Sequence, residues 1–314
     1  MVKLDVLTIN RLKSGLAAFN PSATQLQPSA SLQTYLNFYR LPKPREQLRL
    51  STGTLVVHQT TIFAAAWQPP NPKGTALVIH GYLDHLGLYS HLINFLLDRN
   101  LSVVCFDLPG HGLSGGESAF IEDFADYTHV LDVLIDLCQQ HCPAPLHGLG
   151  QSTGAAILLK HLLASQSGAN YPFRTLNLFA PLLHPAGWWF NRHLLPLVKP
   201  FRKSLRRRFG HSSSDREFLD FLRNQDPLQS TVIPIPWLVA ADQWAREFEA
   251  CEGTDFPVNL IQGNADKTLD WKYNIGVFKQ KLSNMNLHMV AHANHHMVNE
   301  IQPLRTEMFA AIAL

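Results

Sequence analysis

The chain has 314 residues, which is enough for one large domain with an insertion or for two ordinary domains. Hydrophobic residues make up 46% of it and charged residues 16%, a balance typical of a packed globular protein. A formal net charge of +2 argues against a strongly basic nucleic-acid-binding protein, so we expect no nucleic-acid partner.

The cysteines and the N-terminal segment bear on the cellular compartment. The four cysteines (Cys105, Cys138, Cys142 and Cys251) are too few for a disulfide framework, which favours a reducing, cytoplasmic setting. Charged residues interrupt the apolar ones in residues 1–19, unlike in a signal peptide. No stretch approaches the ~18 apolar residues that cross a bilayer. We therefore expect a cytoplasmic protein, whose only membrane contact would be peripheral, at the inner face.

Residues 1–49 are predicted to form an N-terminal arm. Within it, residues 20–31 are rich in Pro, Ser, Ala and Gln, which is typical of a loop, and residues 32–39 are predicted to be helical. Two strand-like runs follow, at 53–58 and 61–67, and the two residues between them predict a β-hairpin.

Short apolar strands and helical segments then alternate along the chain. The predicted strands are 76–80, 102–107, 145–149, 175–180, 258–262 and 287–290, and the predicted helices are 88–97, 121–140, 153–163, 271–282 and about 296–313. This alternation predicts an α/β fold whose mostly parallel sheet has helices on both faces. A long interruption after residue 180 predicts an inserted helical cap, residues 186–255, between two core segments, 50–185 and 256–314.

A G-x-S-x-G motif, Gly150-Gln151-Ser152-Thr153-Gly154, lies between a predicted strand and a predicted helix. A serine hydroxyl is a poor nucleophile at neutral pH. It must therefore sit on a sharp strand-to-helix turn, where a histidine reaches it and the helix N-terminus stabilises negative charge. Gly150 and Gly154 supply the room for such a turn, so Ser152 is the candidate nucleophile. A Gly/Ser loop without chemistry is the alternative.

Candidate partners for Ser152 follow later strands. Asp266 comes just past the predicted strand 258–262, with Asp270 as its rival for the orienting carboxylate. The last strand leads into a histidine-bearing loop, in which His295 or His296 could serve as the base. Because the carboxyl ends of parallel strands meet at one edge of the sheet, we expect these side chains to lie near Ser152.

Four histidines, at 288, 292, 295 and 296, also raise the question of a zinc site. They lack the helical H-E-x-x-H spacing, and no cysteine cluster accompanies them. We therefore expect neither a metal nor another cofactor.

Acyl transfer also requires hydrogen-bond donors aimed at the oxyanion. The backbone N–H of Thr153, just after the nucleophile, is one candidate, and that of Tyr82, in the loop after the predicted strand 76–80, is the other. Gly81 would let this loop pass close to a substrate, although a simple glycine turn would explain Gly81 as well.

Five segments together carry a family resemblance. They are His80-Gly81-Tyr82, Phe106 to Ser114, Gly150 to Gly154, Gly263 to Asp266, and Ala293-Asn294-His295. With them, and with the order Ser, Asp, His, the chain resembles the α/β-hydrolase superfamily, and within it the monoacylglycerol lipase, lysophospholipase and serine aminopeptidase-like group. The resemblance covers residues 76–184 and 256–314. It implies a catalytic histidine two positions after a small residue, which selects His295.

The chain departs from that group in three places. Many members have a glycine and a glutamate where this chain has Leu83 and Asp84, so the acyl-binding entrance is expected to differ. The arm and the cap match nothing that we can place. We therefore expect substrate identity to depend largely on the arm and the cap.

The cap is rich in aromatic and basic residues. It holds four of the six tryptophans, of which Trp188 and Trp189, together with Gly81 and Gln151, are our candidates for substrate binding. The aromatic residues would otherwise only attach the cap to the core. Six basic residues lie beside apolar ones in Lys199 to Arg208, a pattern typical of a cationic amphipathic helix. Such a helix could settle on anionic lipid, or form a solvated face.

The pattern as a whole predicts a cofactor-independent serine hydrolase of carboxylic esters. Lipid-derived esters, such as lysophospholipids or monoacylglycerols, are the expected small-molecule substrates. One alternative is an amide hydrolase of the proline iminopeptidase kind, with Asp242, Glu247 and Glu249 available to hold an amine. Another is a hydrolase fold used only for binding. The sequence carries no prediction of oligomeric state.

Overall fold

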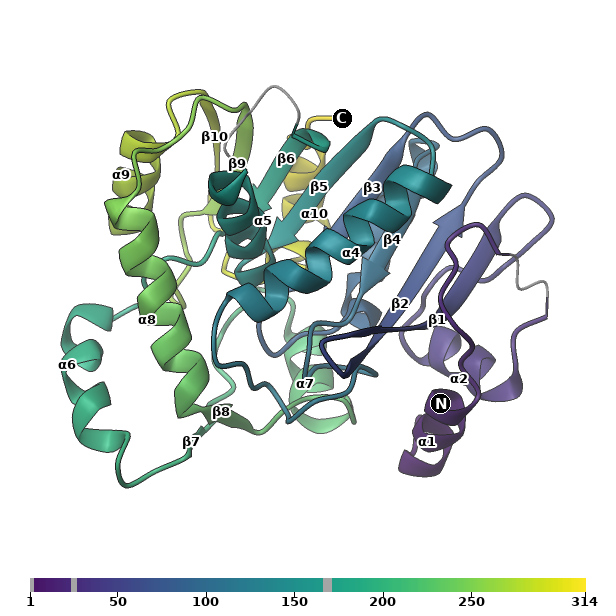
Figure 1. Cartoon of the computed structure of the whole chain (residues 1–314), viewed down its shortest axis with the longest axis horizontal. Coiled ribbons are helices and arrows are strands. Elements are labelled where there is room, and N and C mark those ends of the chain that lie inside the picture. The colour runs from purple at the N-terminus through teal and green to yellow at the C-terminus, as the bar shows by residue number, and fades with distance from the viewer. Residues whose placement is uncertain (1–2, 24–26, 166–170) are drawn as a thin grey trace.

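An eight-stranded sheet forms the centre of the computed structural model, which describes residues 3–23, 27–165 and 171–314 (Figure 1). In spatial order its strands are β1 (Arg49–Val57), β2 (Thr60–Gln68), β4 (Ser102–Phe106), β3 (Thr75–Ile79), β5 (Leu146–Gln151), β6 (Phe173–Phe179), β9 (Val258–Gly263) and β10 (Met285–Val290). β1 and β2 form the predicted hairpin, and β2 is antiparallel to β4. The remaining pairs are parallel, which confirms the predicted sheet.

Helices cover both faces of this sheet. Buried residues of α4 (Ala125–His141), α5 (Thr153–Ala164), α8 (Ile235–Ala250) and α9 (Trp271–Lys281) belong to one core cluster. Those of α3 (Ser90–Asp98) and α10 (Gln302–Ala310) belong to a second cluster. α4 and α5 lie in front of the sheet in Figure 1, and α10 lies behind it. Among the described residues, no helix is long and apolar enough to cross a membrane.

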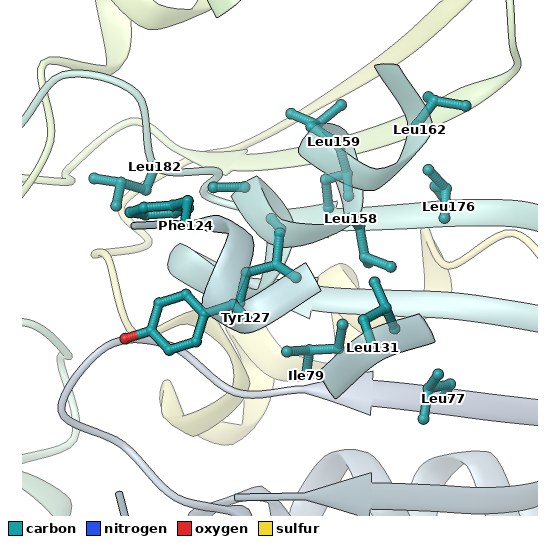
Figure 2. Close-up of a cluster of buried hydrophobic side chains, with 14 of the residues drawn as sticks. Leu77, Ile79, Phe124, Tyr127, Leu131, Leu158, Leu159, Leu162, Leu176 and Leu182 are labelled. Atoms are coloured by element: carbon teal, nitrogen blue, oxygen red, sulfur yellow. The ribbon is translucent and has the colours of Figure 1, made fainter. Parts of the chain in front are cut away.

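The first cluster packs α5, the helix that follows Ser152, against β3 and α4 (Figure 2). Ile79 of β3, Leu131 of α4 and Leu158 of α5 are fully buried in it. Burying one such side chain stabilises the fold by about 1.5–3 kcal/mol relative to leaving it exposed. The helix after Ser152 is therefore held in place by apolar packing against β3 and α4.

The N-terminal arm packs on the outer end of the sheet. Asp5 caps α1 (Val6–Ser14), and Ser29 caps α2 (Ala30–Phe38), each through its side-chain oxygen. Between the two helices, Ala18 forms a parallel bridge with Thr54 of β1. Of the predicted arm and its loop at 20–31, residues 1–2 and 24–26 lie outside the described residues.

The segment between β6 and β9 holds α6 (Trp188–Val198), β7 (Ser204–Arg206), α7 (Arg216–Asn224), β8 (Val232–Pro234) and α8. β7 and β8 pair with each other, apart from the main sheet, and α6 stands away from it (Figure 1). α8 differs from these elements because its buried face joins the core, where the Trp244 indole donates to the Leu182 carbonyl at 3.0 Å. Within the range predicted as cap, α8 thus packs as a core helix.

Two predicted helices were wrong in part. Lys199 to Arg208 is not helical, because α6 ends at Val198 and residues 204–206 pair with β8 as a strand. The terminal helix begins at Gln302 rather than near His296, whose backbone N–H donates to the Ser212 carbonyl, outside any helix. Pro303 lies in the first turn of this helix, where the fixed φ of proline suits a helix start.

Candidate active site

Ser152 occupies a strained turn between β5 and α5. Its φ is 53° and its ψ −108°, a conformation that is unfavourable for a residue other than glycine and that persists where the surroundings enforce it. The neighbouring glycines make the turn possible. A Cβ atom at Gly154 would lie 2.2 Å from the Ile79 carbonyl oxygen, and one at Gly150 would lie 2.5 Å from the Ala155 nitrogen. The backbone thus holds the Ser152 hydroxyl at the carboxyl end of β5.

The structure brings Ser152, His295 and Asp266 together. The Ser152 Oγ lies 3.0 Å from Nε2 of His295, and Nδ1 of His295 lies 2.8 Å from Oδ2 of Asp266. Asp266 is held in turn by the backbone N–H groups of Thr268 and Leu269, which donate to its Oδ1 at 2.8 and 3.1 Å. The three side chains therefore form a continuous hydrogen-bonded chain from carboxylate to hydroxyl.

Charge and burial oppose each other at both titrating groups. Burial by itself lowers the pKa of His295, but the charge and hydrogen bond of Asp266, with a contribution from Asp84, raise this pKa above its ordinary value. For Asp266, burial works to raise the pKa, but His295 and the backbone donors outweigh it and lower the pKa. Asp266 is therefore ionised at neutral pH and favours a proton on the His295 ring.

The rival residues make other contacts. Asp270 caps α9 by accepting a hydrogen bond from the Tyr273 N–H at 3.4 Å. Nε2 of His296 lies 3.1 Å from Asp84, so this ring is paired with a different carboxylate. Of the candidates for orienting acid and base, Asp266 and His295 are the two that form the hydrogen-bonded chain to Ser152.

The loop after β3, residues 80–84, which we call the oxyanion loop, passes beside the nucleophile. A Cβ atom at Gly81 would lie 3.5 Å from Cβ of Ser152. Nδ1 of His80 donates to the Gly81 carbonyl at 2.7 Å, while Nε2 accepts from the Leu108 N–H at 2.9 Å. Burial, with a contribution from the neighbouring His111, lowers the pKa of His80 to about 3, so the ring is neutral and able to accept.

The two predicted oxyanion donors are the backbone N–H groups of Thr153 and Tyr82. Thr153 is the first residue of α5, where a backbone N–H has no partner within the helix. Tyr82 follows Gly81, and its ring stacks on Trp237 of α8 with 3.5 Å between centroids. Their roles toward an oxyanion stay predictions.

Leu83 has an unusual backbone conformation in the oxyanion loop. Its φ is 64°, in the left-handed region that favours glycine, and its side chain is buried. The backbone here thus adopts a conformation suited to glycine although the residue carries a buried apolar side chain.

The candidate substrate-binding residues have protein partners. The Gln151 side chain donates to the backbone carbonyl of His295 at 2.9 Å, and so supports the loop that carries this histidine. The Trp188 indole donates to Asp242 of α8 at 3.2 Å, and the Trp189 ring lies 5.2 Å from that of Tyr273. These two contacts tie α6 to α8 and α9, and contact of these residues with substrate stays a prediction.

Sequence reasoning missed the partnership of Asp84 with His296 and the place of Trp237 beside Tyr82. Asp84 stood out only as a departure from related sequences. The place of Asp84 between Gly81 and Tyr89 could have indicated a structural role. Its partner His296 could not be found this way, because it is 212 positions away along the chain.

The four histidines that raised the zinc question do not converge. His288 lies 3.8 Å from Glu307, whereas His295 and His296 face separate aspartates. Within the part of the chain that the structure describes, no group of three or more His, Cys, Asp or Glu side chains could hold a metal ion.

The strand order, with one antiparallel strand inside a parallel sheet and a serine on the turn after β5, defines the class of α/β-hydrolases. A family model described as "Serine aminopeptidase, S33" matches residues 70–302, and the chain belongs to this family.

Several relatives and solved structures are similar to the chain. Mouse monoglyceride lipase is 31% identical over 226 residues, which cover 67% of this chain and 71% of the relative. Human monoglyceride lipase is 35% identical over 126 residues, covering 39% and 40%. The match to the monoacylglycerol lipase of Mycolicibacterium smegmatis, 31% identical, covers 34% of this chain and spans only 36% of that relative.

A soluble variant of the monoglyceride lipase of Saccharomyces cerevisiae, solved in complex with a substrate analog, has the same fold. Its TM-score is 0.71 at 17% identity, and the match covers 92% of this chain and 96% of that one. At this identity the likeness shows the fold alone.

Proposed function

We propose that the protein is a serine hydrolase that cleaves carboxylic esters through an acyl-enzyme. The observation that carries this proposal is the hydrogen-bonded chain from Asp266 through His295 to Ser152, with 2.8 and 3.0 Å between the paired atoms. Such a chain gives a weakly acidic hydroxyl both a base to receive its proton and a carboxylate to stabilise the resulting imidazolium.

The mechanism follows from these positions. Nε2 of His295 takes the proton of Ser152 as Oγ attacks the ester carbonyl carbon. The backbone N–H groups of Thr153 and Tyr82 stabilise the oxyanion, each contributing about 2.7–4 kcal/mol in comparable sites. His295 then protonates the leaving alcohol, and a water molecule, deprotonated by the same ring, releases the acyl group.

Lipid-derived esters, such as monoacylglycerols or lysophospholipids, are the proposed substrates. The monoglyceride lipases named above support this proposal, as does a Bacillus subtilis phospholipase that is 29% identical over 94 residues, 30% of this chain and 36% of the relative.

An amide hydrolase is the second candidate, because the family description names an aminopeptidase. The acids considered for holding a substrate amine already have protein partners. Asp242 accepts from the Trp188 indole and from Arg246, Glu247 pairs with Lys160, and Glu249 contacts His184 and Tyr273. Since a free amine would have to displace these partners, the contacts favour an ester substrate.

The test compares the wild type with Ser152→Ala on p-nitrophenyl esters of graded acyl length, on a monoacylglycerol, and on aminoacyl amides. We expect ester hydrolysis to fall by about 10⁵- to 10⁶-fold in the variant and a fluorophosphonate probe to label Ser152. Full activity in the variant would contradict the nucleophile assignment. Amide turnover above ester turnover would favour the peptidase, and a folded protein that the probe does not label would favour a binding role.

A second proposal concerns the outer face of the cap. Large apolar side chains are exposed on α6 and just after it, with exposed fractions from 37% to 86% (Trp189, Phe190, Leu194, Leu197, Phe201 and Leu205). Six basic residues lie in Lys199 to Arg208; five of them are exposed, whereas Arg207 is part-buried and donates to the Gln229 side chain. Residues 187–214 include no acidic residue. Although the segment is not the helix expected from sequence, it unites apolar and cationic groups. We propose that this face binds an anionic membrane, with about 1 kcal/mol from each Lys or Arg near the surface.

Co-sedimentation with vesicles tests this proposal. We expect binding to phosphatidylcholine vesicles that contain phosphatidylglycerol, weaker binding without it, and weakening by added salt. The double variant Phe190→Ser/Phe201→Ser should bind less. The matched control Val56→Ser removes an apolar side chain that is 70% exposed on β1, and should bind like the wild type. Absence of wild-type binding, or equal loss in the control, would refute the proposal.

A further inference from the structure

Asp84 lies between two loops that carry groups of the proposed mechanism. It ends the oxyanion loop, and its carboxylate faces the loop at residues 291–296, which we call the histidine loop. Nε2 of His296 is 3.1 Å from each oxygen of this carboxylate. Asp84 and His296 are each only 6% exposed, so solvent screens their contact little.

Tyr89 links this carboxylate to the backbone of the oxyanion loop. The Tyr89 hydroxyl donates to Oδ2 of Asp84 at 3.0 Å and accepts from the Gly81 N–H at 2.9 Å. A Cβ atom at Gly81 would lie 3.1 Å from the same Oδ2, so loop and carboxylate are in close contact. Asp84 therefore holds the Tyr89 hydroxyl, and this hydroxyl holds the Gly81 N–H, one residue before the Tyr82 N–H.

His296 links the same carboxylate to the histidine loop. It directly follows His295, and its ring also packs edge-on against Phe218 of α7, with 4.8 Å between centroids. Its backbone N–H donates to the Ser212 carbonyl. A shift of Asp84 would thus move the chain at His295 as well as the chain at Gly81.

The charge of Asp84 also bears on the base. Burial works to raise the pKa of Asp84, but the contact with His296 and the charge of Arg207 hold this pKa well below its ordinary value. Asp84 is therefore ionised at neutral pH. Two carboxylates favour the protonated form of His295, Asp266 by direct contact and Asp84 from farther away.

We propose that Asp84 is a positioning residue that holds the oxyanion loop and the histidine loop in one arrangement, with its negative charge beside the loop that carries His295. The proposal rests on the hydrolase function proposed above. On this proposal Asp84, which the sequence singled out, has a role in the reaction.

The test measures kcat and the pH dependence of kcat/KM for Asp84→Asn and Tyr89→Phe. For Asp84→Asn we expect kcat to fall by about 10- to 100-fold, since small misplacements of reacting groups are costly. We also expect the acid limb of the pH profile to move to lower pH by on the order of half a unit, because one negative charge is lost near His295. Tyr89→Phe should lower kcat and leave the acid limb in place, because it breaks the link to Gly81 without removing a charge.

Asp226→Asn is the matched control. Asp226 is a buried carboxylate that also pairs with a histidine, 2.9 Å from Nε2 of His85, and accepts from the Tyr39 hydroxyl at 2.7 Å. The raised pKa of His295 is attributed to Asp266 and Asp84, so we expect little effect from Asp226. We expect this variant to lose stability in thermal unfolding without any shift of the acid limb.

The outcomes separate the proposal from the function on which it rests. An acid limb that stays in place in Asp84→Asn, or that moves equally in Asp226→Asn, would overturn it while wild-type ester hydrolysis still stands. Restoration of the acid limb by Asp84→Glu supports it. Should Asp84→Asn fail to fold, an unchanged kcat in Tyr89→Phe would overturn it, whereas inactivity of the wild type would instead remove the proposed function.

Discussion

Two helices of similar length, α5 of the core and α6 of the cap, differ most in how much they bury. Eight of the twelve residues of α5 are buried (Thr153, Gly154, Ala155, Ala156, Ile157, Leu158, Leu159 and Leu162), whereas Trp188 is the only buried residue of α6. The first helix begins at the candidate nucleophile, and the second exposes apolar side chains. The comparison teaches that the proposed nucleophile lies at the start of a helix that is largely buried, while α6 leaves most of its apolar side chains exposed.

The largest effect is expected at the core site, when the carboxylate that orients His295 is removed. Asp266→Asn should lower kcat/KM by about 10⁴-fold, because the amide no longer stabilises the imidazolium. Steady-state kinetics on a p-nitrophenyl ester measures the loss.

Asp270→Asn is the control for that change, since Asp270 lies four positions away and only caps α9. It should keep its activity and lose no more than about 1 kcal/mol of stability. Equal loss of activity in both variants would mean that Asp266 has no special role.

The packing itself can be compared at two leucines. Leu158→Ala on α5 should lower the free energy of unfolding by about 2–5 kcal/mol, because its side chain is fully buried. Leu197→Ala on α6, where the side chain is 67% exposed, should change it by less than about 0.5 kcal/mol. Urea denaturation followed by circular dichroism distinguishes the two, and a larger effect at Leu197 would reverse the comparison.

The pH dependence of kcat/KM tests the role of His295 at the core site. His295 must be neutral to accept a proton, so kcat/KM should rise about tenfold per pH unit on the acid side. Because its pKa is raised above 6.5, the half-maximal value should lie above that pH.

The raised pKa of His295 makes the free energy of unfolding fall, rather than rise, as the pH increases. The contribution from protonated His295 is complete below pH 6.5 and is lost as the pH rises through the raised pKa. The contribution from ionised Asp266 is instead lost as the pH falls through its lowered pKa. An acid limb centred below pH 6.5 would contradict this account of His295.

The smallest effect is expected where α5 meets α8 at the surface. Nζ of Lys160 lies 2.6 Å from Oε2 of Glu247, and the Glu247 side chain is 42% exposed. A double-mutant cycle with Lys160→Met and Glu247→Gln should give a coupling energy of no more than about 1 kcal/mol. A markedly larger value would show that ion pairing, rather than apolar burial, attaches α8 to the core.

Most of the core could be predicted from local pattern. Short apolar strands between helical segments specify the parallel sheet, and the glycines around Ser152 mark the turn that the backbone requires. Asp266, and either His295 or His296, were expected near Ser152 because they follow strands that end at the same sheet edge, and the family resemblance selected His295. The structure places Asp266 and His295 within hydrogen-bonding distance of their expected neighbours.

The features that local pattern could not predict depend on contacts between distant residues. The pairing of β7 with β8 replaces the helix expected at Lys199 to Arg208. The core packing of α8 depends on partners such as Leu182. The contact between Asp84 and His296 depends on how two loops meet, which neither loop specifies alone.

The bridge at Ala18 has a consequence for the free end of the sheet. The Phe19 N–H donates to the Thr54 carbonyl and the Thr54 N–H donates to the Ala17 carbonyl, both at 2.8 Å. These contacts occupy backbone groups of the outermost strand that could otherwise pair with a second molecule. The arm thereby covers the edge of β1 at Thr54, and we expect a shortened protein without the arm to be more prone to pair through that edge.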